Sequence, residues 1–513
     1  MTVDEIVAKL LKNRDLSTPE EIGEFLHPTL PAEIASPFAT SEAIKLIKAH
    51  IKKGHKIAVY GDYDVDGICS TAIMWETLYS SYKNVFPHIP HRESEGYGLS
   101  TKGIDHCLEQ GAKLIIAVDN GIMAHKQIDY CKSKHCDIIV IDHHEPGDLL
   151  PQPTVLLHSI SACAAGLTWL IARDFTGVAN SEQLSLVALA TICDLVPLTG
   201  LNRSFAKYGL DQLKITTRPG LLALYQIARL KPNDLGAYQV GFVLGPRLNS
   251  MGRLEHAIDS LRLLCTKNIS QATQLAQVLD STNRQRQTET EISVTHALGK
   301  INKDAIPAIL VSVDTSYHQG VIGLIASKMV DTYWRPSIAV SIGEEVSKGS
   351  GRSIPGFHLT NYLREFSGLF DSLGGHAMAC GFAIKTKRLD DLFQVLGSAQ
   401  IDPQLLVKSR RVDMEIPLET INFDLLHHIE LLQPFGLGNP TPTFQSSQVV
   451  LSKSRRVGKN FQHLKCQAGD LDAICFNYAP EISSSPASIV YTLEKDTWNG
   501  ADKLQLVIKD IHV

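Results

Sequence analysis

Residues 56–70 read KIAVYGDYDVDGICS and place three carboxylates directly after a short apolar run. Residues 57–59 predict a buried strand, and residues 68–78 are typical of a helix. The acids fall in the turn between these elements: Asp62, Asp64 and Asp66. Carboxylates this close raise one another's pKa, and a divalent cation removes the repulsion. The crowding therefore indicates a metal site, although an ordinary acidic turn has the same composition.

Length and composition limit the class of protein. A chain of 513 residues is too long for one hydrophobic core and predicts roughly three or four domains. Apolar residues make up 44% and charged residues 20%, which is typical of a soluble globular protein. The net charge of −5 does not indicate a nucleic-acid-binding protein, but this sum would hide a local basic groove.

The hydropathy pattern gives no sign of a membrane protein. No apolar run reaches the ~20 residues that a membrane span needs. Residues 1–16 carry acids within their apolar pattern, unlike the apolar region of a signal peptide. The ten cysteines are scattered without a CxxC pair, which favours reduced thiols in a cytosol over disulfides or structural zinc. We therefore expect a cytoplasmic protein with no membrane partner.

The pattern of expected helices and strands changes four times along the chain, which gives five segments: 1–45, 46–215, 216–300, 301–400 and 405–513. The first predicts a helical arm, and the second alternates helix and strand, which favours a parallel, doubly wound sheet. The third is mostly helical and ends in a long polar helix, on the order of 40 Å, that can span two domains. The fourth predicts a smaller α/β unit, and the fifth has short alternating strands typical of a small β-barrel. The expected fold class is α/β with a C-terminal barrel.

Further acids and histidines fall where other apolar elements end: Asp119, Asp142, His143, His144 and Asp194. Because parallel strands end at one edge of a sheet, where ligand sites are built, we expect these groups to converge with the first cluster. Carboxylate oxygens with one or two imidazoles suit Mn²⁺ or Mg²⁺ better than zinc or copper. Two such ions, about 3.5–4 Å apart, clamp a phosphoryl group and activate water for in-line attack.

Four motifs resemble, in order, those of the DHH phosphoesterase family: GDYDVDG, VDNG, DHHEP and ICDLVPL. Other stretches resemble one branch of it, the bacterial RecJ single-strand-specific DNA exonucleases: IPHRESEGYGL (89–99), GPRLNSMGRL (245–254) and NRQRQTET (283–290). The accessory DHHA1 domain of that branch is similar to YHQGVIGLIASK (317–328), SGRSIPGFHL (350–359) and GGHAMACGF (374–382). The entry to its oligonucleotide-binding barrel resembles LLQPFGLGNPTPTF (431–444). The resemblance covers nearly the whole chain.

This resemblance implies an architecture and an activity. The second segment would be the DHH catalytic domain, the fourth the DHHA1 domain, and the fifth an OB-like nucleic-acid-binding domain. The protein would be a hydrolase, a 5′→3′ exonuclease that uses two Mn²⁺ or Mg²⁺ ions. It would degrade single-stranded DNA to mononucleotides in DNA repair and recombination. Single-stranded DNA, a single-strand-binding protein and a helicase are the implied partners.

The resemblance also implies roles for individual residues. The metal ligands would be Asp64, Asp66, Asp119, His143 and Asp194, with Asp119 placed to bridge. The catalytic set would be His144 facing the phosphate, Asp142 orienting its neighbouring histidine, and Asp62 as a further acid of the first motif. The substrate contacts would be Arg92, Arg253, Arg352, Ser353 and His376.

The chain departs from the family pattern at two places. Tyr60 stands where some members carry a histidine that gives one metal an imidazole, which puts the occupancy of one metal site in doubt. His158 and Ser159 stand where the family usually shows Asn-Pro, a change that the sequence does not explain.

Two other functions are compatible with parts of the sequence. Related two-domain proteins are phosphodiesterases of short oligoribonucleotides or cyclic dinucleotides, but a small substrate gives the C-terminal barrel little to hold. Degenerate family members are silent scaffolds of replicative helicases, but those have lost motif acids that this chain keeps. In the barrel, the basic runs 408–411 and 453–459 are either solvated faces or DNA contacts. Phe461, Phe476 and Tyr478 are either stacking partners or core.

Overall fold

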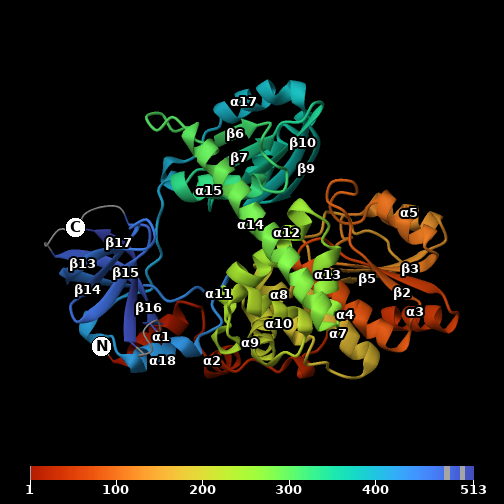
Figure 1. The fold of residues 1–513 in the computed structure, drawn as a ribbon, viewed down its shortest axis with the longest axis horizontal. Helices are drawn as coiled ribbons and strands as arrows, with labels where there is room; N and C mark the ends of the chain where they lie inside the picture. Colours follow the sequence, from red (N-terminus) through yellow and green to blue (C-terminus); the bar gives the residue numbers. More distant parts are fainter. Residues whose placement is uncertain (1, 479–485, 497–502, 513) are drawn as a thin grey trace.

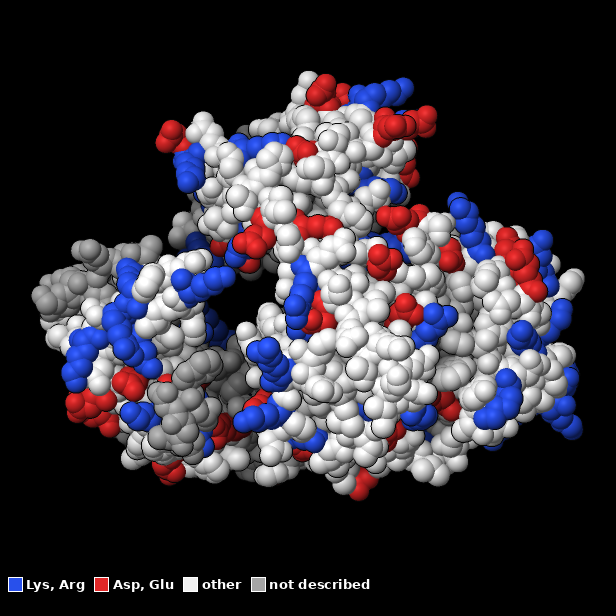
Figure 2. Space-filling model, viewed as in Figure 1, with Lys and Arg blue, Asp and Glu red and all other residues white. Residues whose placement is uncertain are grey.

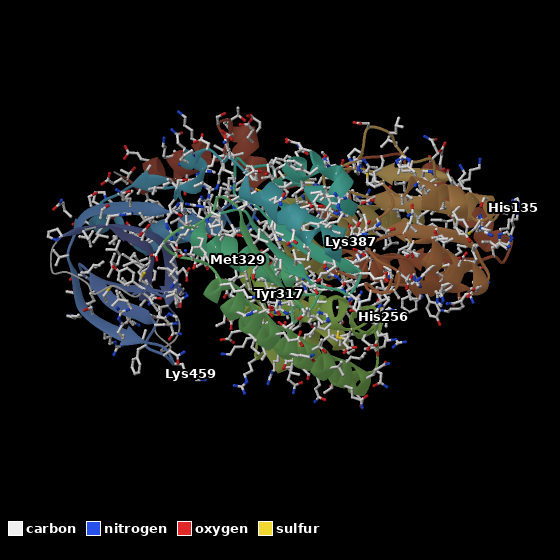
Figure 3. All side chains as sticks on the ribbon, turned by 90° about the horizontal axis from the view of Figure 1, so that it is seen from above. His135, His256, Tyr317, Met329, Lys387 and Lys459 are labelled. Atoms are coloured by element: carbon white, nitrogen blue, oxygen red, sulfur yellow. The ribbon has the colours of Figure 1, made fainter. Side chains whose placement is uncertain are left out.

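A computed structural model describes residues 2–478, 486–496 and 503–512 and arranges them in three lobes, each built on one sheet (Figure 1). The first sheet lies at the right of the view, the second at the top, and the C-terminal sheet at the left. Figure 2 shows an opening between the lobes. Seen from above, Lys459 in the C-terminal lobe and His135 in the first lobe lie at opposite ends of the molecule (Figure 3).

The first sheet confirms the expected parallel sheet, with strand order β2-β1-β3-β4-β5 and every pair parallel. Its strands are β1 (Lys56–Tyr60), β2 (Val85–His88), β3 (Ala112–Val118), β4 (Asp137–Asp142) and β5 (Val155–His158). The central strands are buried on both faces, which explains why their apolar runs are continuous rather than alternating.

Helices surround this sheet and continue into the helical segment. Around the sheet lie α3 (Ser41–Lys52), α4 (Val65–Ser81), α5 (Thr101–Glu109), α6 (His125–Ser133), α7 (Ala164–Thr176), α8 (Leu184–Cys193) and α9 (Gly200–Ile215). The helical segment contains α10 (Pro219–Ala228), the 3₁₀ turn η2 (Pro232–Asp234), α11 (Ala237–Gln239), the π-helix η3 (Val240–Leu244), α12 (Gly245–Leu254) and α13 (Ile258–Cys265). Among the described residues, no helix combines the length and the apolar character needed to cross a bilayer.

The long helix expected over 270–298 is α14 (Ile269–Gly299), which runs from the first lobe to the second (Figure 1). The Asn268 side chain caps it by accepting a hydrogen bond from the Gln271 N–H at 3.0 Å. Ala272, Ala276 and Leu279 recur on one face and are buried against the first lobe. This half of α14 is therefore anchored by packing, and the helix carries the second lobe at its other end.

The second sheet is mixed, with order β6-β7-β8-β10-β9, where only β6 and β7 pair in parallel. Its strands are β6 (Leu310–Asp314), β7 (Ser337–Ser341), β8 (Val346–Arg352), β9 (Phe370–His376) and β10 (Ala379–Lys385). Its helices are α15 (Ile322–Tyr333), α16 (Leu359–Arg364) and α17 (Leu389–Gly397). This is the smaller α/β unit that the sequence predicts.

The C-terminal lobe has seven strands in the order β11-β12-β16-β17-β15-β14-β13. They are β11 (Met414–Glu415), β12 (Phe444–Val449), β13 (Leu451–Val457), β14 (His463–Ala468), β15 (Leu471–Cys475), β16 (Ala487–Asp496) and β17 (Lys503–His512), with α18 (Phe423–Leu431) beside them. The N-terminal helices α1 (Val3–Lys12) and α2 (Pro19–Leu26) pack here, since Ile6, Leu10 and Phe25 share a buried cluster with Phe444 and Ile489. The expected arm therefore contributes to this core, and α3 continues through residue 45 without a break.

Arg203 of α9 joins the first lobe to the C-terminal lobe. Its Nε donates to the Phe25 carbonyl at 2.5 Å, and its Nη2 donates to the carbonyls of Leu432 at 3.1 Å and Gln433 at 2.9 Å. Its guanidinium also lies 3.6 Å from the centroid of the Phe25 ring. One buried cation thus binds carbonyls of the N-terminal arm and of the segment that follows α18. Through this cation, α9 fixes the position of the C-terminal lobe.

A second buried arginine should be essential for the stability of the first lobe. Arg218 is 1% exposed, and its guanidinium lies 2.7 Å from Glu76 Oε2 and 2.9 Å from Glu182 Oε1. We expect Arg218→Met to lower the free energy of unfolding by about 3–5 kcal/mol, because the substitution leaves partly buried carboxylates without their cation. Denaturant unfolding followed by tryptophan fluorescence measures this loss.

The matched control is Asp211→Asn, which breaks the exposed pair of Asp211 and Lys214 on α9. Exposed pairs contribute little, so this variant should lose less than about 1 kcal/mol. Equal losses in the two variants would contradict the role given to Arg218.

Candidate metal centre

The carboxyl edge of the first sheet carries the acidic motif residues. Because β1, β3 and β4 are neighbours, the residues that follow them lie together. Asp142 ends β4, and Asp119 follows β3 with a left-handed φ of 64°. Such a conformation is costly for a non-glycine residue and occurs mostly at functional sites. Asp64 caps α4 by accepting a hydrogen bond from the Gly67 N–H at 3.1 Å, so the start of the helix holds this carboxylate at the same edge.

The Nε2 atom of His143 faces three carboxylates at once. It lies 3.2 Å from Asp119 Oδ1, 3.5 Å from Asp66 Oδ2 and 3.5 Å from Asp194 Oδ2. One ring nitrogen cannot donate to three acceptors, and it has no hydrogen-bond partner among the described residues. Donor atoms around a cation with bonds of about 2.1 Å are about 3 Å apart. The four groups therefore have the spacing of a coordination shell rather than that of an ion pair.

A second set of ligand atoms shares Asp119 with the first. Atoms of Asp62, Asp64 and Asp119 all lie within 4.8 Å of one another. Both carboxylate oxygens of Asp62 are buried and have no hydrogen-bond partner in the part of the chain that the structure describes. Asp62, which the resemblance makes either a ligand or an acid behind the ligands, is placed like a ligand, and Asp119 is placed between the two sets.

The electrostatics of the centre favour cations. Burial, followed by the charge of Asp64, raises the pKa of Asp62 to about 8 and that of Asp66 to about 7. Burial and the neighbouring carboxylates also raise the pKa of Asp119 and of Asp194. Holding these groups ionised together costs free energy, which divalent cations remove.

His143 completes a donor set for hard cations. Burial, followed by the positive charge of His144, lowers the pKa of His143 to about 4, so its ring is neutral and free to bind a metal at pH 7. Carboxylate oxygens with a single imidazole suit Mn²⁺ or Mg²⁺. The residues fit two such ions: His143 with Asp66, Asp119 and Asp194 for one, and Asp62, Asp64 and Asp119 for the other. A ligand atom of His144 also lies within 4.8 Å of those of Asp119 and His143.

His144 lies beside these ligands, and it is the histidine that Asp142 orients. The His144 Nδ1 lies 2.7 Å from Asp142 Oδ1, and the His144 Nε2 lies 2.9 Å from the Tyr97 hydroxyl. Burial opposes protonation of His144, but the hydrogen bond and charge of Asp142 outweigh it, and the pKa rises to about 9. The structure therefore holds a cationic imidazole in a fixed orientation next to the metal ligands.

The structure shows what His158 and Tyr60, two of the residues that depart from the family pattern, contact in this chain. His158 Nε2 lies 2.8 Å from the His144 carbonyl oxygen, so the histidine fixes the backbone of the DHH motif. The Tyr60 hydroxyl donates to the Gly98 carbonyl at 3.1 Å, and its ring packs in the buried cluster with Ile104. Tyr60 is thus a core residue in this chain, and the metal centre is built without it.

Arginines from both lobes gather beside the centre. Burial and the charges of Arg92, Arg286 and Arg352 lower the pKa of Arg253 to about 10. Arg92 follows β2, Arg253 is in α12, Arg286 in α14 and Arg352 in β8. Arg253 also donates to the Gly320 carbonyl of the second lobe at 3.1 Å. Like charges this close are unfavourable alone, and phosphate groups are the anions that guanidinium forks bind best.

The two remaining predicted substrate contacts, His376 and Ser353, differ in their surroundings. His376, exposed at the end of β9, lies close enough for its charge to lower the pKa of His143, so it is near the centre. Ser353 is buried, and its hydroxyl donates to the Phe357 carbonyl at 2.6 Å. The neighbouring Ser350 hydroxyl instead accepts a hydrogen bond from Arg352 at 3.1 Å. A phosphate contact by Ser353 remains a prediction.

The sequence interpretation does not single out three residues that the structure brings to the site: Tyr97, Arg286 and Ser350. Each lies within a stretch that carries the family resemblance, and Ser350 opens SGRSIPGFHL. The resemblance could therefore have pointed to these three residues. Without it, a single tyrosine, arginine or serine has no spacing that marks it as part of a site.

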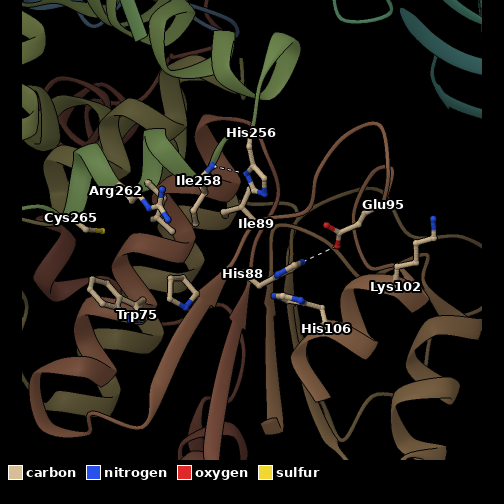
Figure 4. A pocket seen from close by; sticks show the side chains of 12 residues that line it. Trp75, His88, Ile89, Glu95, Lys102, His106, His256, Ile258, Arg262 and Cys265 are labelled. Carbon is tan, nitrogen blue, oxygen red and sulfur yellow. Dashed lines mark hydrogen bonds and ion pairs between the residues drawn. The ribbon is translucent and has the colours of Figure 1, made fainter. Parts of the chain in front are cut away.

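A cavity of about 790 Å³ lies close by but is separate from the centre (Figure 4). Its walls include Trp75, Leu261 and Ile258, and none of the four acidic motifs lines it. Figure 4 shows Glu95 bonded to His88 at its edge, at 2.9 Å. Since Glu95 belongs to the same stretch as Arg92 and Tyr97, this contact helps to fix the loop beside the metal centre.

Comparison with known proteins assigns the family. Three family models match: "DHH family, N-terminal domain" over 56–191, "DHHA1 domain" over 306–400 and "RecJ OB domain" over 412–510. The chain is 34% identical to the single-stranded-DNA-specific exonuclease RecJ of Bacillus subtilis, over 100% of this chain and 68% of that protein. It is 30% identical to the RecJ of Salmonella typhimurium, over 99% and 95% of the two chains. The chain belongs to the RecJ family.

A solved structure from the RecJ family has the same architecture. The crystal structure of RecJ from Thermus thermophilus in complex with Mn²⁺ is 27% identical, with a TM-score of 0.87, over 99% of this chain and 76% of that one. The DHH, DHHA1 and OB domains that the resemblance implied are therefore confirmed, and so is a centre suited to Mn²⁺ or Mg²⁺.

Proposed function

We propose that this member of the RecJ family is a metal-dependent exonuclease that degrades single-stranded DNA from the 5′ end to mononucleotides, in DNA repair and recombination. The observation that carries this proposal is the convergence of Asp66, Asp119 and Asp194 on the His143 Nε2 at the edge of the first sheet. A silent scaffold would not need this convergence, which costs stability when no cation is bound.

The protein groups divide the chemistry among them. Two bound divalent ions supply charge neutralisation of the phosphodiester and a nucleophilic water at neutral pH. The carboxylates and His143 fix where that charge lies, and Asp142, 2.7 Å from the His144 Nδ1, orients the His144 ring. The cationic His144 stabilises negative charge that develops on the phosphate. The arginines beside Arg253 hold neighbouring phosphates of the strand.

Selection of single strands follows from where the centre lies. Arg352 and His376 come from the second lobe, whereas the metal ligands come from the first, so the substrate lies between lobes that α14 holds together. We infer that the passage excludes a duplex by size.

The C-terminal lobe provides further contacts for the strand. Phe461, 70% exposed, follows the basic β13, and Phe476, 53% exposed, follows β15 and lies against His463 of β14, whereas Tyr478 packs against the core of this lobe. An exposed ring next to a basic strand suits base stacking and phosphate binding. We propose a cytoplasmic site of action, with a single-strand-binding protein and a helicase as partners.

Arg352 should act on substrate binding. We expect Arg352→Gln to raise the KM for single-stranded DNA by about 10- to 100-fold, because a charged hydrogen bond to phosphate contributes about 1.5–3 kcal/mol. The salt dependence of binding should also become shallower, since one phosphate contact is lost. Steady-state kinetics at several salt concentrations measure both effects. Arg364→Gln, at an exposed arginine of α16, is the control, and equal effects of the two substitutions would refute this role.

The function itself is tested by digestion of end-labelled DNA with Mn²⁺. Single-stranded DNA should be degraded from the 5′ end to mononucleotides, whereas a blunt duplex should remain intact. Faster hydrolysis of a dinucleotide than of a long strand would favour the small-substrate phosphodiesterase. The absence of hydrolysis with both Mn²⁺ and Mg²⁺ would favour the silent scaffold.

A further inference from the structure

Tyr238 of α11 and Phe242 of η3 form an exposed aromatic pair. Their ring centroids are 5.0 Å apart and the rings are nearly parallel, at 26°. Tyr238 is 66% exposed and Phe242 is 70% exposed. α11 borders the opening between the three lobes (Figure 1), which Figure 2 shows as open space with lysine or arginine side chains along its wall. Large exposed rings are costly in water, so a pair held in register indicates a ligand.

A π-helix presents these rings. Pro246 has no N–H to donate to the Phe242 carbonyl, and the Gly245 N–H instead bonds to Val240 five residues back. A π segment inside a helix is rare and occurs mostly at functional sites. Because Tyr238 and Phe242 are four residues apart, they lie on one face of the segment, where one ring supports the other.

The glycines of this segment pack against the end of α8, directly before the metal ligand Asp194. A Cβ on Gly245 would lie 2.4 Å from the Cys193 Sγ, and one on Gly241 would lie 3.6 Å from Ile192. Only glycine at 245 allows the segment to pack so closely against the end of α8, which Asp194 follows directly. The segment that carries the aromatic pair therefore contacts the residues that directly precede the metal ligand Asp194.

We propose that Tyr238 and Phe242 are a stacking platform for a nucleobase of the strand that is being degraded, on its way from the C-terminal lobe to the metal centre. This inference rests on the proposed function. Every base has a π-face, so such a platform grips single strands of any sequence, whereas in a duplex the bases are already stacked and paired. The exposed Arg229 and Lys231 precede the pair in the sequence and suit the backbone phosphates.

The test compares strands with and without bases. The double variant Tyr238→Leu, Phe242→Leu keeps the apolar bulk but removes the rings. With Mn²⁺ withheld, it should bind an oligothymidylate of about 20 nucleotides on the order of 10-fold more weakly than the unmodified protein. Its affinity for an abasic strand of the same length should stay the same. The double variant Tyr238→Trp, Phe242→Trp keeps two aromatic rings and should bind the oligothymidylate as tightly as the unmodified protein does.

A fluorescent base and a control variant sharpen the test. With 2-aminopurine moved along the strand, one position should be quenched in the unmodified protein and bright in the leucine variant. Tyr79→Leu disturbs another stacked pair, Trp75 and Tyr79 on α4, and should change neither binding nor quenching. The platform would be wrong if the leucine variant lost as much affinity for the abasic strand as for the oligothymidylate. It would also be wrong if the leucine variant bound and degraded single-stranded DNA as well as the unmodified protein does. Failure of the unmodified protein to degrade single-stranded DNA would instead overturn the proposed function.

Discussion

Asp119→Asn should reduce hydrolysis of single-stranded DNA by about 10³-fold or more, because Asp119 belongs to both sets of ligand atoms. Asparagine keeps the volume and one oxygen but removes a negative charge from each set. Rate measurements with saturating Mn²⁺ give the size of the loss. Normal turnover by this variant would show that the metal assignment is wrong.

The same substitution should not unfold the protein. Burial and neighbouring carboxylates raise the pKa of Asp119, so its ionised form destabilises the metal-free fold, and this cost grows as the pH rises through the folded-state pKa. Metal-free Asp119→Asn should therefore melt at the same temperature as the unmodified protein or higher. Mn²⁺ should raise the Tm of the unmodified protein, and the variant should lose most of that rise. Asp129→Asn, at an exposed acid of α6, is the control and should keep both rate and shift.

His144→Gln should lower kcat by about 10²- to 10³-fold while leaving the KM for single-stranded DNA and the Mn²⁺ dependence nearly unchanged. The reason is that the His143 Nε2 faces the carboxylates of Asp66, Asp119 and Asp194, whereas the His144 Nδ1 is held by Asp142. Its pKa of about 9 in the metal-free protein means that the ring is cationic at pH 7 and loses its charge as the pH rises. Bound cations lower this value, so the alkaline limb of the rate profile should lie below about pH 9 and vanish in the variant.

Tyr97→Phe is the matched comparison, since it removes only the hydroxyl that lies 2.9 Å from the His144 Nε2. We expect a reduction of less than about 10-fold, with the alkaline limb preserved. If His144→Gln raised the KM for Mn²⁺ instead of lowering kcat, His144 would be a metal ligand and its proposed role would be wrong.

The catalytic sheet could be predicted because its central strands are continuous apolar runs buried on both faces. The edge strands β2 and β5 are hard to predict, because VFPH and VLLH are short and end in histidine. The strand β14 is also hard to predict. Its buried residues alternate, at Leu464, Cys466 and Ala468, but cysteine and alanine are weak apolar signals. The packing of the N-terminal helices on the C-terminal lobe joins Ile6 to residues more than 400 positions away, a contact that no local pattern encodes.

The metal centre was predictable for a similar reason. Acids that follow buried parallel strands must meet at one edge, so Asp119 and Asp142 could be placed from the sequence. The arginine cluster depends on how α12, α14 and β8 meet, which spacing does not reveal. The partners of single hydroxyls are equally hard to predict: Ser353 stands next to Arg352 in the sequence, yet its hydroxyl donates to the Phe357 carbonyl, and the Ser350 hydroxyl accepts from the guanidinium.

The central claim is that one pocket at the sheet edge holds two cations that share Asp119. Anomalous diffraction at the manganese edge, from crystals grown with Mn²⁺, tests it most directly. We predict two peaks about 3.5–4 Å apart, one beside the His143 Nε2 and the other beside Asp62 and Asp64, with the Asp119 carboxylate between them. A single peak remote from Asp119, or no ordered manganese at this edge, would contradict the account.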